Sequence, residues 1–135
     1  MSFVGLHGYV VGFAIPALWL IICLWALVLR LRRAEESPIF WRVVSVAQIL
    51  VALQFFLGLA LLTLYSLGRA GLPGDGSAFD VTFHLLYGAG FPLAVLVVAH
   101  RGARDGRFDP FAAFAVVGLV IFGLTARAWM VGAGL

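Results

Sequence analysis

The chain has 135 residues, of which 64% are hydrophobic and 11% are charged, and its formal net charge is +3. A soluble domain of this size needs far more polar surface, so the composition excludes an ordinary soluble globular protein. Every basic residue is an arginine, and most arginines lie in short segments between apolar runs, so the charge does not indicate nucleic-acid binding. We expect a single transmembrane domain, residues 1–135, in a lipid bilayer.

Four membrane spans are predicted in chain order, at about residues 3–29, 38–67, 80–100 and 110–132. The first is too long for the apolar part of a signal peptide and has no basic residue before it, so we expect it to remain a span. Ser37 and Asp109 each precede a proline and are the expected N-caps of the second and fourth spans. Asp80 is the expected N-cap of the third, after a glycine- and proline-rich loop at 68–79.

The arginines predict the orientation of these spans. Segments 30–37 and 101–109 each hold three arginines, segment 68–79 holds one, and none precedes the first span. The positive-inside rule places segments 30–37 and 101–109 in the cytoplasm, and both termini and segment 68–79 outside, of a bacterial inner membrane. The expected fold is therefore all-α, an integral membrane four-helix up-down bundle.

The two halves of the chain resemble each other. Each half begins with a histidine near the outer end of a span, His7 or His84, and has a proline eight or nine residues later, Pro16 or Pro92. An arginine-rich segment and a proline-started span follow in both. This pattern favours two duplicated helical hairpins, although hydrophobic sequences also match by chance.

The histidine pair is the main functional feature of the sequence. At about 1.5 Å per helical residue, His84 lies about 25 Å from Arg101, and Arg127 lies about 27 Å from Asp109. His7 reaches a similar depth, so all three side chains meet near the outer boundary of the hydrocarbon. Two imidazoles on parallel helices can approach an iron from opposite sides, so His7 and His84 are predicted to bind the metal of one haem b.

Two glycines and an arginine complete the predicted cofactor site. Gly88 lies one turn from His84, Gly123 lies one turn from Arg127, and glycine lets a flat ring approach a helix closely. Arg127 is expected to pair with a haem propionate, because an unpaired charge in a span is costly. The alternatives are that the histidines only form hydrogen bonds, that Arg127 extends to the headgroups, and that the glycines pack helices.

The residue types inside the spans narrow the function further. No Asp or Glu lies deep in a span, which argues against proton relays and cation-coupled transport, and no nucleotide-binding loop or catalytic residue set is recognisable. No histidine of the first span matches the depth of His100, so a second haem is not expected. Gln48 and Gln54 are expected to form hydrogen bonds between helices, and Gln54 could also line a quinone-like pocket.

The arrangement resembles one four-helix half of the haem A synthase family. The resemblance is carried by His7, His84 and the segments 54–58 (QFFLG) and 123–127 (GLTAR). It implies paired four-helix bundles in which histidines of the first and third helices ligate haem. This chain has one bundle and no Glu-x-x-His element, so the resemblance implies a haem-holding scaffold without the oxygenase-like catalysis of that family.

The sequence predicts a small subunit of a bacterial respiratory or photosynthetic electron-transfer complex that binds one haem b. A larger membrane protein complex is the expected partner, with a quinone or a cytochrome as the electron partner, and no independent catalytic activity is expected. The alternative is a cofactor-free accessory or assembly subunit that packs against a larger membrane complex.

Overall fold

The computed structural model describes residues 3–68 and 76–135, and all regular structure within these residues is helical. The predicted all-α class is therefore confirmed for the described part of the chain. The elements in chain order are α1 (Phe3–Gly5), η1 (Leu6–Val11), α2 (Gly12–Leu31), α3 (Pro38–Ser66), α4 (Ala78–Leu85), η2 (Leu86–Gly90), α5 (Phe91–Arg104) and α6 (Pro110–Gly132), where η denotes a π-helical segment.

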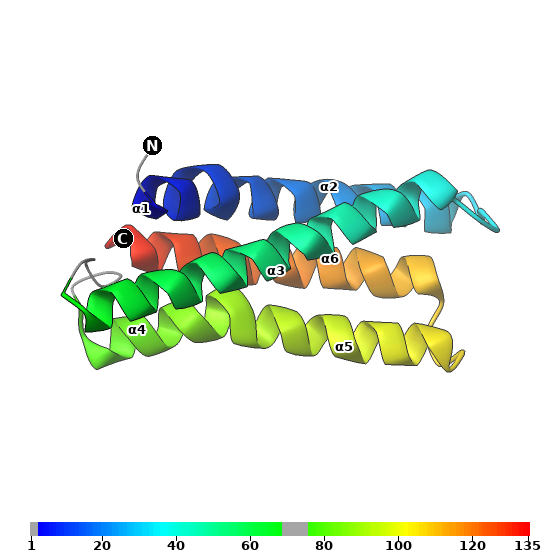
Figure 1. Cartoon of the computed structure of the whole chain (residues 1–135). Helices are drawn as coiled ribbons and strands as arrows, with labels where there is room; N and C mark the ends of the chain where they lie inside the picture. The colour runs from blue at the N-terminus through cyan, green and yellow to red at the C-terminus, as the bar shows by residue number, and fades with distance from the viewer. Residues whose placement is uncertain (1–2, 69–75) are drawn as a thin grey trace.

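These elements form four long helical segments that lie side by side (Figure 1). The first segment consists of α1, η1 and α2, the second of α3, the third of α4, η2 and α5, and the fourth of α6. The start of α1 and the end of α6 lie at the same end of the molecule as the end of α3 and the start of α4, and the other two links lie at the opposite end. The most extensive contact is between α2 and α6, whereas α3 packs mainly on the first segment.

Each segment is long and apolar enough to cross a membrane, as the residues Leu6–Leu31, Pro38–Ser66, Ala78–Arg104 and Pro110–Gly132 show. The second and fourth agree with the predicted spans 38–67 and 110–132, and the first ends at Leu31 rather than at residue 29. The third extends beyond the predicted 80–100 at both ends. Its last turn contains Arg101 and Arg104, whose positive charges interact favourably with the negative end of the helix dipole.

The predicted 68–79 loop is described only in part. Residues 69–75, which include Arg69, Pro73 and Asp75, lie outside the described residues. On the two sides of that segment Gly68 and Gly76 have φ angles of +69° and +79°. Glycine adopts such left-handed angles without a steric penalty, so the residue type at positions 68 and 76 suits the backbone conformation there.

Serine and aspartate begin three of the helices. The Ser77 hydroxyl accepts a hydrogen bond from the Asp80 N–H at 3.1 Å and caps α4, so the prediction that Asp80 is the N-cap is wrong. Asp80 lies instead in the first turn, where a carboxylate is favourable to the helix dipole. Asp109 caps α6 as predicted, because its Oδ1 accepts from the Ala112 N–H at 2.8 Å. Ser37 occupies the N-cap position of α3 without a side-chain cap bond.

Replacing Asp109 with alanine is expected to lower the free energy of unfolding by about 1 kcal/mol, because the Ala112 N–H loses its cap. The carboxylate also lies 3.4 Å from Arg30 Nε, but both side chains are roughly half exposed, so the ion pair adds little. Asp109→Asn keeps the cap and is the matched control, with a smaller loss. Unfolding in detergent, followed by circular dichroism, measures both variants, and equal losses would show that the cap is not the cause.

Two π-helical segments, η1 and η2, interrupt the first and third helical segments. Each precedes a proline, Pro16 or Pro92, which lacks an N–H and whose ring clashes with the carbonyl four residues earlier. That earlier residue is glycine in both cases, Gly12 and Gly88. The wider turn is seen directly at Gly12, whose N–H donates to the His7 carbonyl five residues before it. The repeated prolines thus lie beside a backbone irregularity that the sequence pattern did not predict.

The core of the molecule is formed by residues of α2, α3, α5 and α6, and the contact between α2 and α6 is the most extensive. Trp19, Ile22 and Ile121 are completely buried there. At Gly118 the two backbones approach so closely that an added Cβ would lie 2.7 Å from Trp19 O and 2.8 Å from Cys23 N. Any side chain at this position would force the helices apart, so glycine is what permits their contact.

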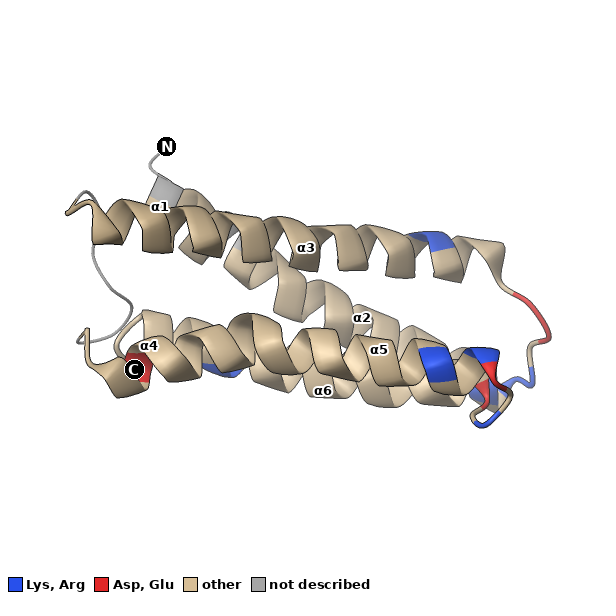
Figure 2. Ribbon diagram, turned by 60° about the horizontal axis from the view of Figure 1, so that its bottom comes forward, with Lys and Arg blue, Asp and Glu red and all other residues tan. Residues whose placement is uncertain are grey.

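The surface divides into an apolar belt and a charged end. Large exposed apolar side chains occur on all four segments, for example Leu24, Ile49, Val98 and Leu119. Charged residues are concentrated at the end of the molecule where links 32–37 and 105–109 lie (Figure 2). Long apolar surfaces with charge at a helix end are the distribution that a bilayer favours.

Candidate functional site

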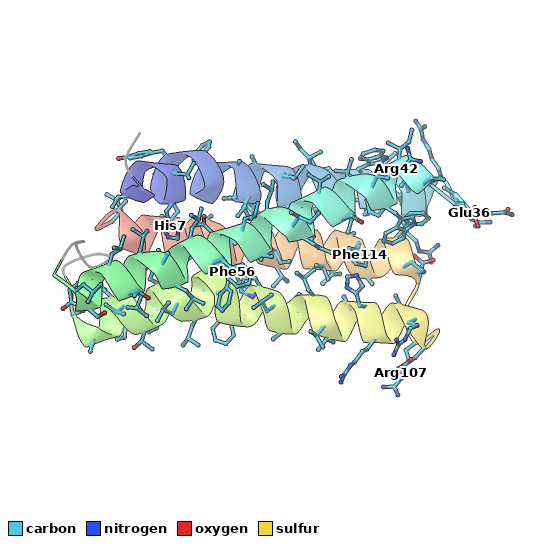
Figure 3. The ribbon with its side chains drawn as sticks, in the orientation of Figure 1. His7, Glu36, Arg42, Phe56, Arg107 and Phe114 are labelled. Atoms are coloured by element: carbon cyan, nitrogen blue, oxygen red, sulfur yellow. The ribbon has the colours of Figure 1, made fainter. Side chains whose placement is uncertain are left out.

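Both histidines of the repeat line a cavity of about 280 Å³ at the end of the molecule where the chain termini lie. Their Nε2 atoms are 3.5 Å apart, and their ring planes are tilted by 55° with centroids 5.8 Å apart. Residues of all four helical segments form the wall. Figure 3 shows His7 among the side chains at this end of the molecule. The structure therefore brings together the two side chains that the sequence matched by depth.

His84 is oriented by a backbone carbonyl. Its Nδ1 lies 2.9 Å from the carbonyl oxygen of Ala128, near the end of α6. Because a carbonyl only accepts, Nδ1 carries the proton and Nε2 presents its lone pair toward His7. Metal-ligating histidines are usually held in this way, with the second ring nitrogen donating to a carbonyl or carboxylate. Gly132 leaves the space for the ring, since an added Cβ there would lie 3.0 Å from His84 Cε1.

His7 is contacted from the side by Gln54 of α3. The Gln54 amide nitrogen donates to the His7 carbonyl oxygen at 3.2 Å and lies 3.4 Å from His7 Nε2. Among the described residues, His7 Nδ1 and Gln54 Oε1 are buried without a hydrogen-bond partner. Buried polar atoms almost always have a partner, so the described residues do not complete the polar network around His7 by themselves.

Glycines line the cavity on every helical segment, namely Gly8, Gly12, Gly58, Gly88 and Gly132. An added Cβ at Gly58 would lie 3.5 Å from His7 Cε1, and one at Gly88 would lie 3.6 Å from Ala128 Cβ. Gly88 thus lies on the wall of the cavity that contains both histidines. Small residues around the two rings are what close approach of a flat group would require.

Arg127 and Gly123 lie on the outer face of α6. Both are exposed and neither lines the cavity, and no described atom lies within 4 Å of a Cβ added at Gly123. The cavity face of α6 is formed by Thr125, Ala128 and Trp129. The expected roles of Arg127 at a propionate and of Gly123 in the slot do not fit this placement. Their depth matches that of the histidines, but the helix turns them to the opposite side.

The third histidine, His100, belongs to a separate contact near the arginine-rich end. Its Nδ1 donates to the Leu96 carbonyl at 2.9 Å, and its Nε2 accepts from the Gln48 amide at 3.2 Å. The ring also meets the edge of Phe114, with centroids 5.2 Å apart. Gln48 and Gln54 thus both form hydrogen bonds between helices, as the sequence predicts.

The residues that position the two imidazole rings could not be identified from the sequence. Ala128 contacts His84 through its backbone carbonyl, which every residue type has, so the sequence does not indicate this role. Gly132 lies at the expected end of the fourth span, where a glycine is ordinary and does not indicate a contact with His84. Gly58 is part of the segment that carries the family resemblance, but its contact with His7 could not be predicted from it. The one feature of the sequence that could have indicated this site is the number of glycines at the same depth as His7 and His84.

The geometry limits what the site can bind. Within residues 3–68 and 76–135, no three His, Cys, Asp or Glu side chains lie close enough together to hold a metal ion, whereas zinc sites take three or four protein ligands. His7 and His84 would be the residues that hold the iron of a haem, whose ring would supply the other ligands. A metal in line between two imidazoles separates their nitrogens by about 4 Å. The 3.5 Å between the two Nε2 atoms is close to the separation that one metal ion held by both rings would require.

Comparison of the chain with protein-family models, with curated proteins and with solved structures found no match. The geometry of the histidine cavity is therefore the basis for the functional interpretation.

Replacing Gln54 with leucine is expected to lower the free energy of unfolding by about 0.6 kcal/mol, the average for hydrogen bonds between membrane helices. The same change releases the His7 ring, so its modification by diethyl pyrocarbonate, followed by mass spectrometry, should become faster. Gln48→Leu is the matched control, because it breaks a similar contact at the other end of the molecule. Equal acceleration of His7 modification in both variants would show that Gln54 does not position this ring.

Proposed function

We propose that the chain is a small integral membrane subunit of a bacterial respiratory or photosynthetic electron-transfer complex and that it holds one haem b between His7 and His84. The observation that carries this proposal is the pair of Nε2 atoms 3.5 Å apart in a glycine-lined cavity. The hydrogen bond from His84 Nδ1 to Ala128 adds to it, because it leaves Nε2 free as a metal ligand.

The proposed arrangement in the membrane is an up-down four-helix bundle. The four apolar segments cross the bilayer of the bacterial inner membrane, and the arginine-rich segments 30–37 and 101–109 lie in the cytoplasm. Both termini and segment 68–79 then lie outside, so the histidine cavity is near the outer face. The clustering of charge at one end of the molecule supports this orientation (Figure 2).

In this proposal the chain binds and orients the cofactor, and the bound haem supplies one-electron transfer. The Ala128 carbonyl fixes the ring of His84 and raises its basicity as a ligand. The glycines of the cavity wall would admit a flat group beside the two rings. Since Arg127 faces outward, the polar side chains of the described cavity wall that could meet propionates include Tyr9, Tyr65 and Trp129.

The resemblance to one half of the haem A synthases supports a role in holding haem. These 135 residues contain no Glu-x-x-His element, so the proposed role is electron transfer or cofactor holding rather than oxidation of the haem. A neighbouring quinone or cytochrome in the larger complex would exchange the electron.

The pyridine haemochrome assay on detergent-purified protein from a haem-replete host tests this function. We expect about one haem b per chain, since one pair of axial ligands holds one iron. The contact between His100 and Gln48 shows that a histidine here can simply link helices, which favours the alternative of a cofactor-free accessory subunit. A colourless protein that co-purifies with a large membrane complex would support that alternative and exclude the haem proposal.

A further inference from the structure

A second depression lies near the arginine-rich end of the molecule, between α5 and α6. Its volume is about 680 Å³, and small or branched apolar side chains form its walls, among them Ala94, Val98, Ala112, Val116 and Val120. From Ala112 to Val120 it follows α6 for about 12 Å at about 1.5 Å per residue. One hydrocarbon leaflet is about 15 Å deep, so the groove has the length of an acyl chain segment in that leaflet.

The turn after α5 fixes Arg107 at the mouth of this groove. The Arg107 N–H donates to the Gly102 carbonyl at 2.8 Å and the Gly106 N–H donates to the Ala103 carbonyl at 3.2 Å, which is a Schellman helix end. Gly106 has a φ of +68°, which glycine adopts at little cost. The Phe108 N–H also donates to Gly102, and its ring covers this residue. The backbone position of Arg107 is therefore set by hydrogen bonds on both sides of the turn.

The acidic side chains near the mouth of the groove pair with arginines other than Arg107, so Arg107 is available to bind an anion. Asp109 also lines the groove, but its Oδ1 lies 3.4 Å from Arg30 Nε, which compensates its charge. Arg104 lies 4.0 Å from the Asp105 carboxylate. Arg107 forms no ion pair with any acidic side chain of the described residues. The mouth of an apolar groove thus carries one uncompensated guanidinium group.

We propose that the groove between α5 and α6 binds an anionic phospholipid, with an acyl chain along the valines and alanines and the phosphate at Arg107. Figure 3 shows Arg107 at the charged end of the molecule, where headgroups would lie. A guanidinium group binds phosphate with a fork of two N–H donors. Basic residues between membrane helices on the cytoplasmic side attract anionic lipids. This inference rests on the proposed membrane insertion but not on the proposed haem.

Native mass spectrometry of the full chain in detergent, titrated with phosphatidylglycerol or with phosphatidylcholine of the same acyl chains, tests the site. Wild-type protein should bind phosphatidylglycerol with a Kd about fivefold lower, the effect of one basic residue near a membrane surface. Arg107→Gln should remove this preference. Arg104→Gln is the matched control and should keep it, because Arg104 belongs to the same turn but does not line the groove.

A second pair of variants tests the apolar part of the groove. Val116→Phe fills it and should weaken the binding of both lipids, whereas Leu119→Phe, outside the groove on α6, should not. Equal binding of the two lipids by wild-type protein, or equal effects of Arg107→Gln and Arg104→Gln, would overturn the proposal. Binding of inorganic phosphate at Arg107 without binding of phosphatidylglycerol would assign the site to a free anion and would also overturn the proposal. Helicity and haem content should be unchanged in these variants, so failure here is distinct from failure of the haem proposal.

Discussion

Replacing His84 with alanine is expected to reduce the haem b bound per chain at least about tenfold, while helicity stays unchanged. The Nε2 atom that faces His7 is lost, and with it the hydrogen bond that connects the ring to Ala128. The side chain is only partly buried, so its removal costs little packing. The pyridine haemochrome assay and circular dichroism on the same samples measure both quantities.

His100→Ala is the matched control for this prediction. It also removes an imidazole that links two helices, but at the opposite end of the molecule from the cavity. Bound haem should remain at the wild-type level in this variant. His84→Gly with added imidazole should regain haem, because the free ligand fits the space of the lost ring. Equal haem loss in His84→Ala and His100→Ala would show that His84 is not a ligand.

Replacing Gly118 with valine is expected to lower the stability of the protein strongly. An added Cβ would lie 2.7 Å from Trp19 O and 2.9 Å from Cys23 Cα, and these are backbone atoms that cannot move independently of α2. Overpacking of a tight core costs about 1–3 kcal/mol, and more where backbone must shift. Thermal unfolding in detergent, followed by circular dichroism, should show a lower Tm.

Gly123→Val on the same helix is the control. Gly123 is exposed, and no described atom lies within 4 Å of an added Cβ, so its substitution should leave the Tm nearly unchanged. It should also leave the haem content unchanged, since Gly123 does not line the cavity. Similar losses of stability at Gly118 and Gly123 would contradict the account of the contact between α2 and α6.

The helical fold could be predicted from the sequence because its determinants are local. Apolar runs of sufficient length mark each long helix, and a cap followed by proline marks the start at Pro38 and Pro110. The start of the third segment was misplaced, because Ser77 and Asp80 are both suitable caps. The two π-helical segments could not be predicted, because they depend on how each helix accommodates its proline within the packed molecule.

For the candidate site, the sequence predicts how far along its helix each residue lies, but not which side of the helix it occupies. Counting residues at constant rise placed His7 and His84 at one depth, and the structure brings them into contact. The same count placed Arg127 at that depth, but it does not determine which side of α6 faces the cavity. In a chain this apolar, the outward and inward faces have similar compositions, so hydrophobic periodicity does not identify the inner one. The partner of His7, Gln54, was recognised as an interhelical residue, but its contact required the structure.

The most direct test of the central claim, that His7 and His84 bind the same iron, is low-temperature electron paramagnetic resonance of the oxidised protein. We predict a low-spin ferric signal typical of two imidazole ligands, and its replacement by a high-spin signal in His7→Ala, where one axial ligand is lost. A high-spin signal in the wild-type protein, or a low-spin signal that persists in His7→Ala, would contradict the claim.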